Sequence, residues 1–250
     1  MAETLVIVPT YNESQSLPQI ITRIVAAVPE VDILVVDDAS PDGTGHIADG
    51  LATTYSQLHV LHRDAKDGLG RAYLAGFQRA LAGGYDVAVE IDADGSHDPA
   101  ELPAMLAAAR DGAALVIGSR WVPGGSIRDW PWLRQAISRS GNWYARAALR
   151  CRTRDITAGY RVYRTEVLRD MHLETVSSQG YCFQVEMAWR IERAGHRIVE
   201  HPIEFVERSA GASKMHAGIV VEALLRVTGW GIADRFGRFP RARQLPKAQS

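Results

Sequence analysis

The sequence has few cysteines, no excess of basic residues and no long hydrophobic run. Its two cysteines, Cys151 and Cys182, form no CxxC pair and therefore predict neither a disulfide framework nor a zinc site. A net charge of -1 over 250 residues excludes the general basic surface that nucleic-acid binding usually requires. The longest stretch without a charged side chain, Gly50 to His62, holds 13 residues, well short of the roughly 18 that indicate a membrane-spanning helix.

Targeting signals and common nucleotide-binding motifs are also missing. The N-terminus enters an apolar segment almost at once, without the basic region and small-residue cleavage site of a signal peptide. We therefore expect a cytoplasmic protein without a transmembrane helix. No GxGxxG follows the first apolar segment and no GxxxxGK[ST] occurs, so the sequence predicts neither a dinucleotide site nor a P-loop.

The first half of the chain alternates short apolar runs with segments of helical periodicity. The runs predict strands at 5–8, 33–36, 59–61, 87–91 and 115–118. The periodic segments predict helices at 17–28, 47–55, 71–81 and 99–109. This alternation favours a Rossmann-like α/β fold, in which helices flank a doubly wound, mostly parallel sheet.

The second half of the chain is less regular. Residues 120–140 contain two prolines and three tryptophans and predict a loop over a site. Beyond it we expect a helix at 138–149, a strand at 160–163, a helix at 183–194 and one strand at 198–206. The expected division is a catalytic domain over 1–215 and an amphipathic helix with a basic tail over 216–250.

Polar residues follow four of the predicted strands. They are Pro9 to Glu13 after the first strand, Asp37 and Asp38 after the second, Asp92 and Asp94 after the fourth, and Ser119 and Arg120 after the fifth. In open α/β sheets, ligands bind at the carboxyl ends of the strands. One ligand that touches all four strand ends is the simplest interpretation.

The segment "IDADGSHDP" places Asp92 and Asp94 one residue apart at the end of an apolar run. Two carboxylates in this position repel each other and need a cation. Oxygen ligands favour Mg²⁺ or Mn²⁺, and Mg²⁺ is typically held by one or two carboxylates together with substrate phosphates. A role as caps of a loop or of the following helix is an equally open interpretation of this short motif.

Several motifs occur together in one order along the chain: "VPTYNE", "VVDDASPDGT", "IDADGSH", "GSRWVPGG", "DITAGYRVYR", "GYCFQVEM" and "ERSAGASK". As a set, they resemble the inverting GT-A glycosyltransferases of family 2, and within these the polyprenol (dolichol) phosphate mannose synthases. The resemblance covers about residues 4–215. It implies a GT-A fold, a nucleotide-sugar donor and a lipid phosphate acceptor.

The resemblance also implies roles for individual residues on the donor side. The nucleoside pocket corresponds to Pro9, Tyr11, Glu13, Val36 and Asp38, and the donor and metal motif to Asp92, Ala93 and Asp94. Asp94 is the first candidate for a metal ligand, with Asp92 beside it. Many relatives have Gln at the position of Ser96, so in this chain water or His97 is expected to fill the third ligand position.

On the acceptor side, Arg120, Arg134 and Ser138 match the family positions that receive the acceptor phosphate. With Asp92 and Asp94 they form the catalytic set that the resemblance implies. Arg208 and Lys214 match a late basic pair over the donor diphosphate, with solvated surface charges as the alternative. A structural or sugar-pocket role is expected for Asp155, Gly159 and Arg161, and a sugar contact or core packing for Gln184 and Glu186.

The expected reaction is the inverting, metal-dependent transfer of mannose from GDP-mannose to a polyprenyl phosphate. Three alternatives stay open: a UDP-glucose or other nucleotide-sugar donor, a nucleotidyltransferase, and a non-catalytic nucleotide-sugar-binding scaffold of a membrane complex. From Arg226 onward the tail carries six basic residues against one acid, Asp234: Arg226, Arg235, Arg238, Arg241, Arg243 and Lys247. It predicts peripheral binding to an anionic cytoplasmic membrane surface, or to an integral membrane partner, and a docked helix with a disordered basic end is the open alternative.

Overall fold

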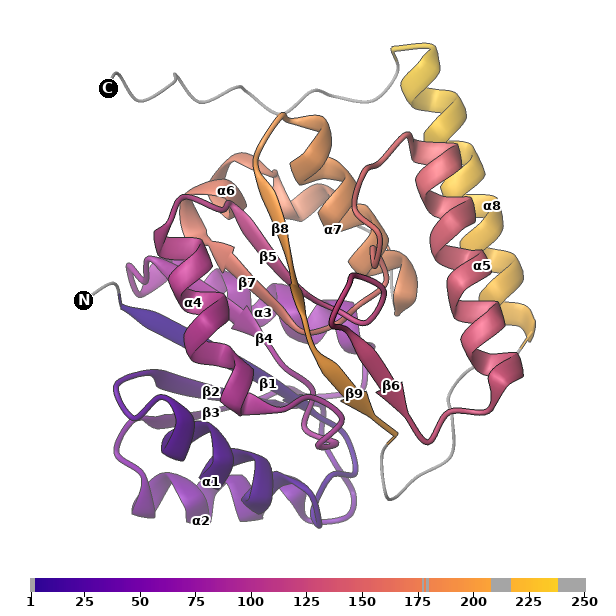
Figure 1. Ribbon diagram of the computed structural model, residues 1–250. Helices are drawn as coiled ribbons and strands as arrows, with labels where there is room; N and C mark the ends of the chain where they lie inside the picture. The colour runs from indigo at the N-terminus through magenta and orange to yellow at the C-terminus, as the bar shows by residue number, and fades with distance from the viewer. Residues whose placement is uncertain (1–2, 177, 179, 208–216, 238–250) are drawn as a thin grey trace.

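The computed structural model describes residues 3–176, 178, 180–207 and 217–237, and its centre is a seven-stranded sheet (Figure 1). The strands lie in the order β3-β2-β1-β4-β7-β5-β8. Their bounds are β1 Thr4–Thr10, β2 Asp32–Asp37, β3 Leu58–His62, β4 Val87–Glu90, β5 Leu115–Ser119, β7 Arg161–Arg164 and β8 Ile198–Pro202. The first five match the strands predicted from the apolar runs to within two residues at either end.

Helices cover both faces of this sheet. They are α1 Leu17–Ala27, α2 Thr44–Thr54, α3 Leu69–Ala82, α4 Leu102–Arg110, α5 Trp132–Leu149, α6 Thr165–Asp170, α7 Tyr181–Arg193 and α8 Ala217–Arg235, with short 3-10 turns at Pro99–Glu101 and Leu173–Thr175. One hydrophobic core lies between the sheet and α1, α2 and α4, and a second between the sheet and α3, α5, α6 and α7. The predicted doubly wound α/β architecture is therefore confirmed.

The strand order changes direction between β1 and β4. The strands β1, β2, β3 and β4 pair in parallel, whereas β7 lies antiparallel between β4 and β5. The ends of β1, β2, β4 and β5 consequently meet at one edge of the sheet. This edge is where open α/β proteins bind ligands.

Three predicted elements of the second half of the chain differ from the structure. The helix expected at 138–149 begins at Trp132, directly after Pro131, because a proline at a helix start removes no intrahelical hydrogen bond. The strand expected at 198–206 is two strands, since the buried Ile203 separates β8 from β9 (Glu204–Val206). β9 pairs in parallel with β6 (Ser126–Arg128), so part of the expected loop 120–140 is a small second sheet.

Helices α5 and α8 lie side by side at one edge of the molecule (Figure 1). The Tyr144 and Thr228 hydroxyl groups are 2.5 Å apart, and the Trp189 and Trp230 rings stack with centroids 5.9 Å apart, so α8 also packs on α7. Unlike the amphipathic helix expected, α8 has apolar side chains on both its packed and its exposed faces, with Leu225 69% exposed. Among the described residues, no helix is long and apolar enough to span a membrane. The basic residues from Arg238 onward lie outside the described part.

Candidate active site

Hydrogen bonds to Asp37 and to Thr44 hold together the end of β1, the end of β2 and the loops that follow them. Asp37 is buried and accepts hydrogen bonds from the Thr10 hydroxyl at 2.9 Å and from the Ser40 hydroxyl at 2.6 Å. The Glu13 amide donates to the Thr44 hydroxyl at 3.0 Å across the two loops. The structure therefore brings Pro9, Tyr11 and Glu13 next to Val36 and Asp38, because Pro9 lies opposite Val36 in the β1–β2 register.

Two of these predicted nucleoside-binding residues already contact cationic side chains. Asp38 is buried and pairs with Arg63 at 2.5 Å between its Oδ1 and the guanidinium Nη1. The ammonium group of Lys66 lies 3.8 Å from the centroid of the Tyr11 ring, a cation–π distance. Both cations come from the segment after β3, a contribution for which the sequence interpretation gave no signal.

Asp42 fastens the loop after β1 to the start of α2. Its carboxylate accepts hydrogen bonds from the Ser14 amide at 3.1 Å and from the Thr44 amide at 3.0 Å. Slight burial acts to raise the pKa of Asp42, but the hydrogen bonds from Thr44 and Ser14 outweigh it and lower the pKa to about 2. The carboxylate is therefore charged, and accepts these bonds, throughout the neutral range.

We expect Asp42→Ala to lower the free energy of unfolding at pH 7 by about 1 kcal/mol, the usual net contribution of a side-chain hydrogen bond. Because folding depresses this pKa, the stabilisation is complete above the ordinary value of 3.8 and is lost as the pH falls toward about 2. Urea denaturation at pH 7 and pH 3 measures the deficit, which should narrow at pH 3. Asp42→Asn is the matched control, since the carbonyl oxygen of an asparagine side chain can still accept from these amides; an equal loss in both variants would contradict the assignment.

Asp92 and Asp94 stand just beyond the end of β4. The Tyr73 hydroxyl, from α3, donates to Asp92 Oδ1 at 3.0 Å, and the Ser96 amide donates to Asp94 Oδ1 at 3.0 Å. Burial, and then the charge of Asp92, raise the pKa of Tyr73 well above its ordinary value. Tyr73 is therefore a permanent hydrogen-bond donor that orients Asp92. At Gly159 an added Cβ would lie 3.5 Å from Asp92 Oδ2, so the chain passes close to this carboxylate.

The donor set at this strand end fits a divalent cation that also binds substrate oxygens. It offers the carboxylates of Asp92 and Asp94 and the buried Ser96 hydroxyl, for which there is no hydrogen-bond partner among the described residues. Within the same part of the chain, no three His, Cys, Asp or Glu side chains come together as a metal site. His97 thus does not complete a three-ligand set. It is buried between Tyr160 and Phe205, and burial lowers its pKa to about 4, so the ring is neutral.

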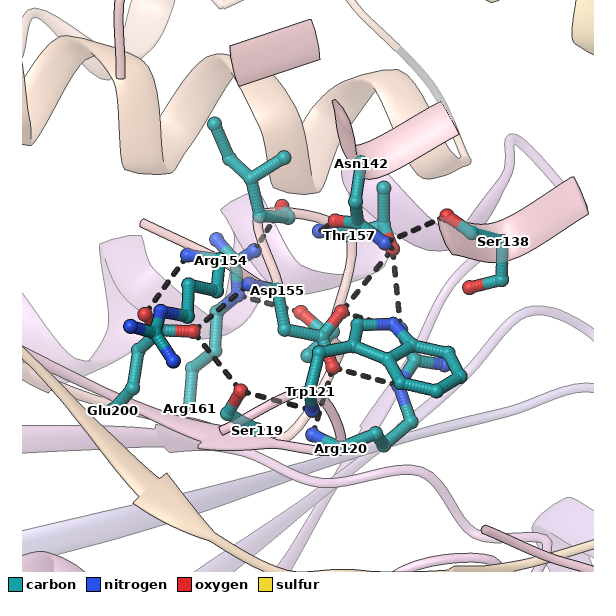
Figure 2. A network of polar contacts seen from close by, with 12 residues as sticks. Ser119, Arg120, Trp121, Ser138, Asn142, Arg154, Asp155, Thr157, Arg161 and Glu200 are labelled. Carbon is teal, nitrogen blue, oxygen red and sulfur yellow. Dashed lines mark hydrogen bonds and ion pairs between the residues drawn. The ribbon is translucent and has the colours of Figure 1, made fainter. Parts of the chain in front are cut away.

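Arg120, at the end of β5, is held by a buried ion pair (Figure 2). Its guanidinium donates from Nε to Asp155 Oδ2 at 2.8 Å and from Nη2 to Asp155 Oδ1 at 2.6 Å, and its backbone amide donates to the same carboxylate at 2.9 Å. Glu200, on β8, holds the Asp155 amide at 2.8 Å and the Ser119 hydroxyl at 2.9 Å. Because Asp155 is fully buried, this network fixes the position and plane of the guanidinium.

Arg134 and Ser138 approach the same region from α5. The Arg134 guanidinium lies 4.1 Å from the Trp130 ring centroid and pairs with Glu207, while the Arg120 guanidinium lies 5.5 Å from the same ring. The Ser138 carbonyl accepts from the Asn142 side chain, which also donates to the Thr157 hydroxyl (Figure 2). Arg120 and Arg134 therefore share one aromatic ring, and Ser138 is linked to Arg120 through Asn142 and Thr157.

Other predicted residues take structural positions. The fully buried Arg161 donates to the carbonyl oxygens of Ile156, Ala158 and Gln184 at 2.7–2.8 Å. Glu186 is buried beside Arg190 and the Ser178 hydroxyl, in keeping with core packing. The Gln184 amide group is buried beside the carboxyl group of the buried Glu90. Arg208 and Lys214 lie outside the part of the chain that the structure describes.

The family model for glycosyl transferase family 2 matches residues 5–171. Among curated proteins, the chain is 57% identical over 232 residues to the undecaprenyl-phosphate mannosyltransferase of Micrococcus luteus, covering 93% of this chain and 95% of that protein. It is 54% identical over 236 residues to the polyprenol monophosphomannose synthase of Mycolicibacterium smegmatis, covering 94% of this chain and 89% of that protein.

A solved structure of similar fold is the glucosyl-3-phosphoglycerate synthase of Mycobacterium tuberculosis in complex with Mn²⁺, UDP and glucosyl-3-phosphoglycerate. It has a TM-score of 0.63 and 20% sequence identity, and the match covers 96% of this chain and 81% of that one. This likeness supports the fold. Together with the family match and the two curated relatives, it leads to one conclusion: the protein is a glycosyltransferase that belongs to family 2 and has the α/β GT-A fold that its motifs predict.

Proposed function

We propose that this enzyme transfers mannose from GDP-mannose to a polyprenyl phosphate, with inversion at the sugar carbon, and so makes a polyprenyl-phosphate mannose for glycan synthesis. The observation that carries the proposal is the 57% identity, over nearly the whole chain, to a protein named as an undecaprenyl-phosphate mannosyltransferase. In this proposal, residues 1–215 form the catalytic domain and residues 216–250 attach it to a membrane or to a membrane protein.

On the donor side, Tyr11 and Glu13 with Asp38 hold the nucleoside between the ends of β1 and β2. Their support is the tethering of these two loops through Asp42 and Thr44, which keeps the pocket in shape before the donor arrives. Pro9 and Val36 form its apolar floor, Ala93 lies beside the diphosphate, and Arg208 and Lys214 complete the donor contacts.

Asp94 and Asp92 are the residues that would hold Mg²⁺ or Mn²⁺. When bound, such an ion neutralises the charge that develops on the departing diphosphate. Tyr73 keeps Asp92 oriented for this purpose through its hydrogen bond at 3.0 Å. The proposal needs two protein carboxylates, with the remaining ligands supplied by the diphosphate and water.

On the acceptor side, an oxygen of the lipid phosphate forms the new bond to the sugar carbon as the bond to the diphosphate breaks. A phosphate oxygen is ionised near neutral pH, so this step requires no strong general base. Its main obstacle is repulsion between two anions, which Arg120 and Arg134 offset and Ser138 helps to orient. Asp155 is a positioning residue, because it fixes Arg120 without being needed at the reacting atoms.

The choice of donor is tested by a transfer assay with purified protein, a short polyprenyl phosphate in detergent, Mn²⁺ or Mg²⁺, and radiolabelled GDP-mannose beside UDP-glucose. We expect labelled lipid from GDP-mannose at least about tenfold faster than from UDP-glucose, since an unpaired polar group in a sugar or base pocket costs about 1–3 kcal/mol.

Label from UDP-glucose alone would replace the donor and keep the reaction class. Tight GDP binding without transfer to lipid from either donor would overturn the enzyme proposal in favour of a nucleotide-sugar-binding scaffold.

The place of the reaction is proposed to be the cytoplasmic membrane face. A flotation assay with anionic vesicles and a variant lacking residues 235–250 tests that, and undiminished binding would remove the tail from the proposal.

A further inference from the structure

A cavity opens beside the predicted acceptor residue Arg120, between the loop after β5 and helix α5. It has a volume of about 410 Å³. Four arginines line it: Arg120, Arg139, Arg146 and Arg154. The other lining residues are Trp121, Val122, Gly125, Asn142 and Trp143, and no Asp or Glu lines it among the described residues. The cavity is therefore strongly cationic.

The positive charge of this cavity is balanced only at Arg120. Asp155 pairs with Arg120 from behind the cavity wall. By contrast, Arg139, Arg146 and Arg154 form no ion pair with any carboxylate of the described residues. Like charges gathered in a pocket repel one another, and an anion that binds between them removes that repulsion.

Hydrogen-bond donors in the cavity wall are also unused. The Nε–H of Arg146 and the indole N–H of Trp121 are buried and have no acceptor among the described residues. The central carbon of the Arg139 guanidinium lies 4.5 Å from the centroid of the Trp121 ring, a cation–π contact. Guanidinium groups match phosphate oxygens in geometry and charge, so the arginines that line the cavity suit a phosphate.

The outer face of α5 suits the hydrocarbon part of a lipid. Trp132, Arg139, Trp143 and Arg146 follow one another at spacings of 7, 4 and 3 residues and therefore lie along one face of the helix. Trp132 is 78% exposed and Trp143 is 69% exposed. Exposed tryptophans next to arginines are typical of surfaces that meet a lipid headgroup and its chain.

We propose that the cavity between the β5 loop and α5 binds the phosphate group of a lipid through Arg139, Arg146 and Arg154, next to the transfer position at Arg120. The inference rests on the proposed function in one respect, since the acceptor polyprenyl phosphate is then the lipid phosphate that must reach Arg120. An anionic phospholipid of the bilayer has the same headgroup chemistry, and the experiment below separates the two sources.

The test uses the full chain with the double variant Arg146→Gln/Arg154→Gln. Arg150→Gln is the matched control, because Arg150 is an exposed arginine at the end of the same helix and lies outside this cavity. Affinity for farnesyl phosphate is measured by titration calorimetry, and affinity for phosphatidylcholine vesicles with and without phosphatidylglycerol by flotation. We expect the double variant to lose at least about tenfold in one of these affinities, equal to about 1.4 kcal/mol.

The two sources give different patterns. If the cavity receives the acceptor, farnesyl phosphate binding falls and vesicle binding does not; if it receives a bilayer phospholipid, binding to the phosphatidylglycerol vesicles falls and farnesyl phosphate binding does not. In both cases we expect the double variant to bind GDP within about twofold of the wild-type affinity and to keep the wild-type thermal midpoint of unfolding. If these arginines only stabilised the fold, the thermal midpoint would fall.

Unchanged binding of both probes, or an equal loss in Arg150→Gln, overturns the inference. Because both readouts measure binding, they do not depend on turnover. A wild-type enzyme that binds farnesyl phosphate through these arginines but transfers no sugar overturns the proposed function and leaves the phosphate site standing.

Discussion

Asp94→Ala is expected to lower the rate of sugar transfer to the lipid by about a thousandfold or more, at saturating Mn²⁺ and donor. Asp94 lies just beyond the end of β4 and is the stronger candidate of the two carboxylates proposed to hold the metal. A metal at the departing diphosphate contributes several kcal/mol to the transition state, and about 4 kcal/mol corresponds to about a thousandfold in rate. The rate is measured in the transfer assay with GDP-mannose, and Mn²⁺ binding in the presence of GDP is measured separately.

Asp98→Ala is the matched control for this prediction. Asp98 lies in the same loop, but its side chain is 52% exposed and pairs with the 45% exposed Arg23. An exposed pair of this kind contributes less than about 1 kcal/mol, so we expect its transfer rate within about twofold of wild type. If Asp94→Ala kept more than a tenth of the wild-type rate, or still bound Mn²⁺ normally, Asp94 would not be the metal ligand.

The sequence predicted the candidate site best where polar residues directly follow an apolar strand. Apolar runs located β1, β2, β4 and β5, and the parallel topology then placed Glu13, Asp38, Asp92 and Arg120 at one edge of the sheet. This worked because a buried parallel strand is a continuous apolar run and its end is marked by the first polar residues. Motif resemblance supplied the family, which periodicity alone does not identify.

The partners of these residues could not be predicted in the same way. Glu200 lies 81 residues from Ser119 and reaches it only because β8 pairs with β5, and nothing in the sequence around 200 indicates that pairing. The strand expected at 198–206 is interrupted because Ile203 returns to the core, a tertiary effect that strand propensity does not detect. Three arginines of the cavity between the β5 loop and α5 could not be predicted for the same reason, since Arg154 joins Arg139 and Arg146 only in the folded chain.

Asp155→Asn is expected to lower the free energy of unfolding by about 3–5 kcal/mol. The substitution keeps the shape of the side chain but leaves the Arg120 guanidinium, which is 8% exposed, without its carboxylate. Breaking a buried ion pair on one side costs this much because the remaining charge stays desolvated. Urea denaturation measures the loss, and a deficit under about 1 kcal/mol would contradict the role given to this pair.

The double variant Arg120→Met/Asp155→Asn separates stability from function at this site. It removes both charges, while the Asn oxygen can still accept the Arg120 backbone amide hydrogen bond that Asp155 accepts at 2.9 Å. We therefore expect it to recover at least about 2 kcal/mol of the stability lost by Asp155→Asn, since apolar replacement of a whole buried pair is often neutral. Transfer activity should stay lost, because screening of the acceptor phosphate requires the guanidinium itself. Recovery of activity together with stability would show that the pair serves the fold alone. The acceptor phosphate would then have to be held by Arg134 and by Arg139, Arg146 and Arg154 of the cavity beside α5.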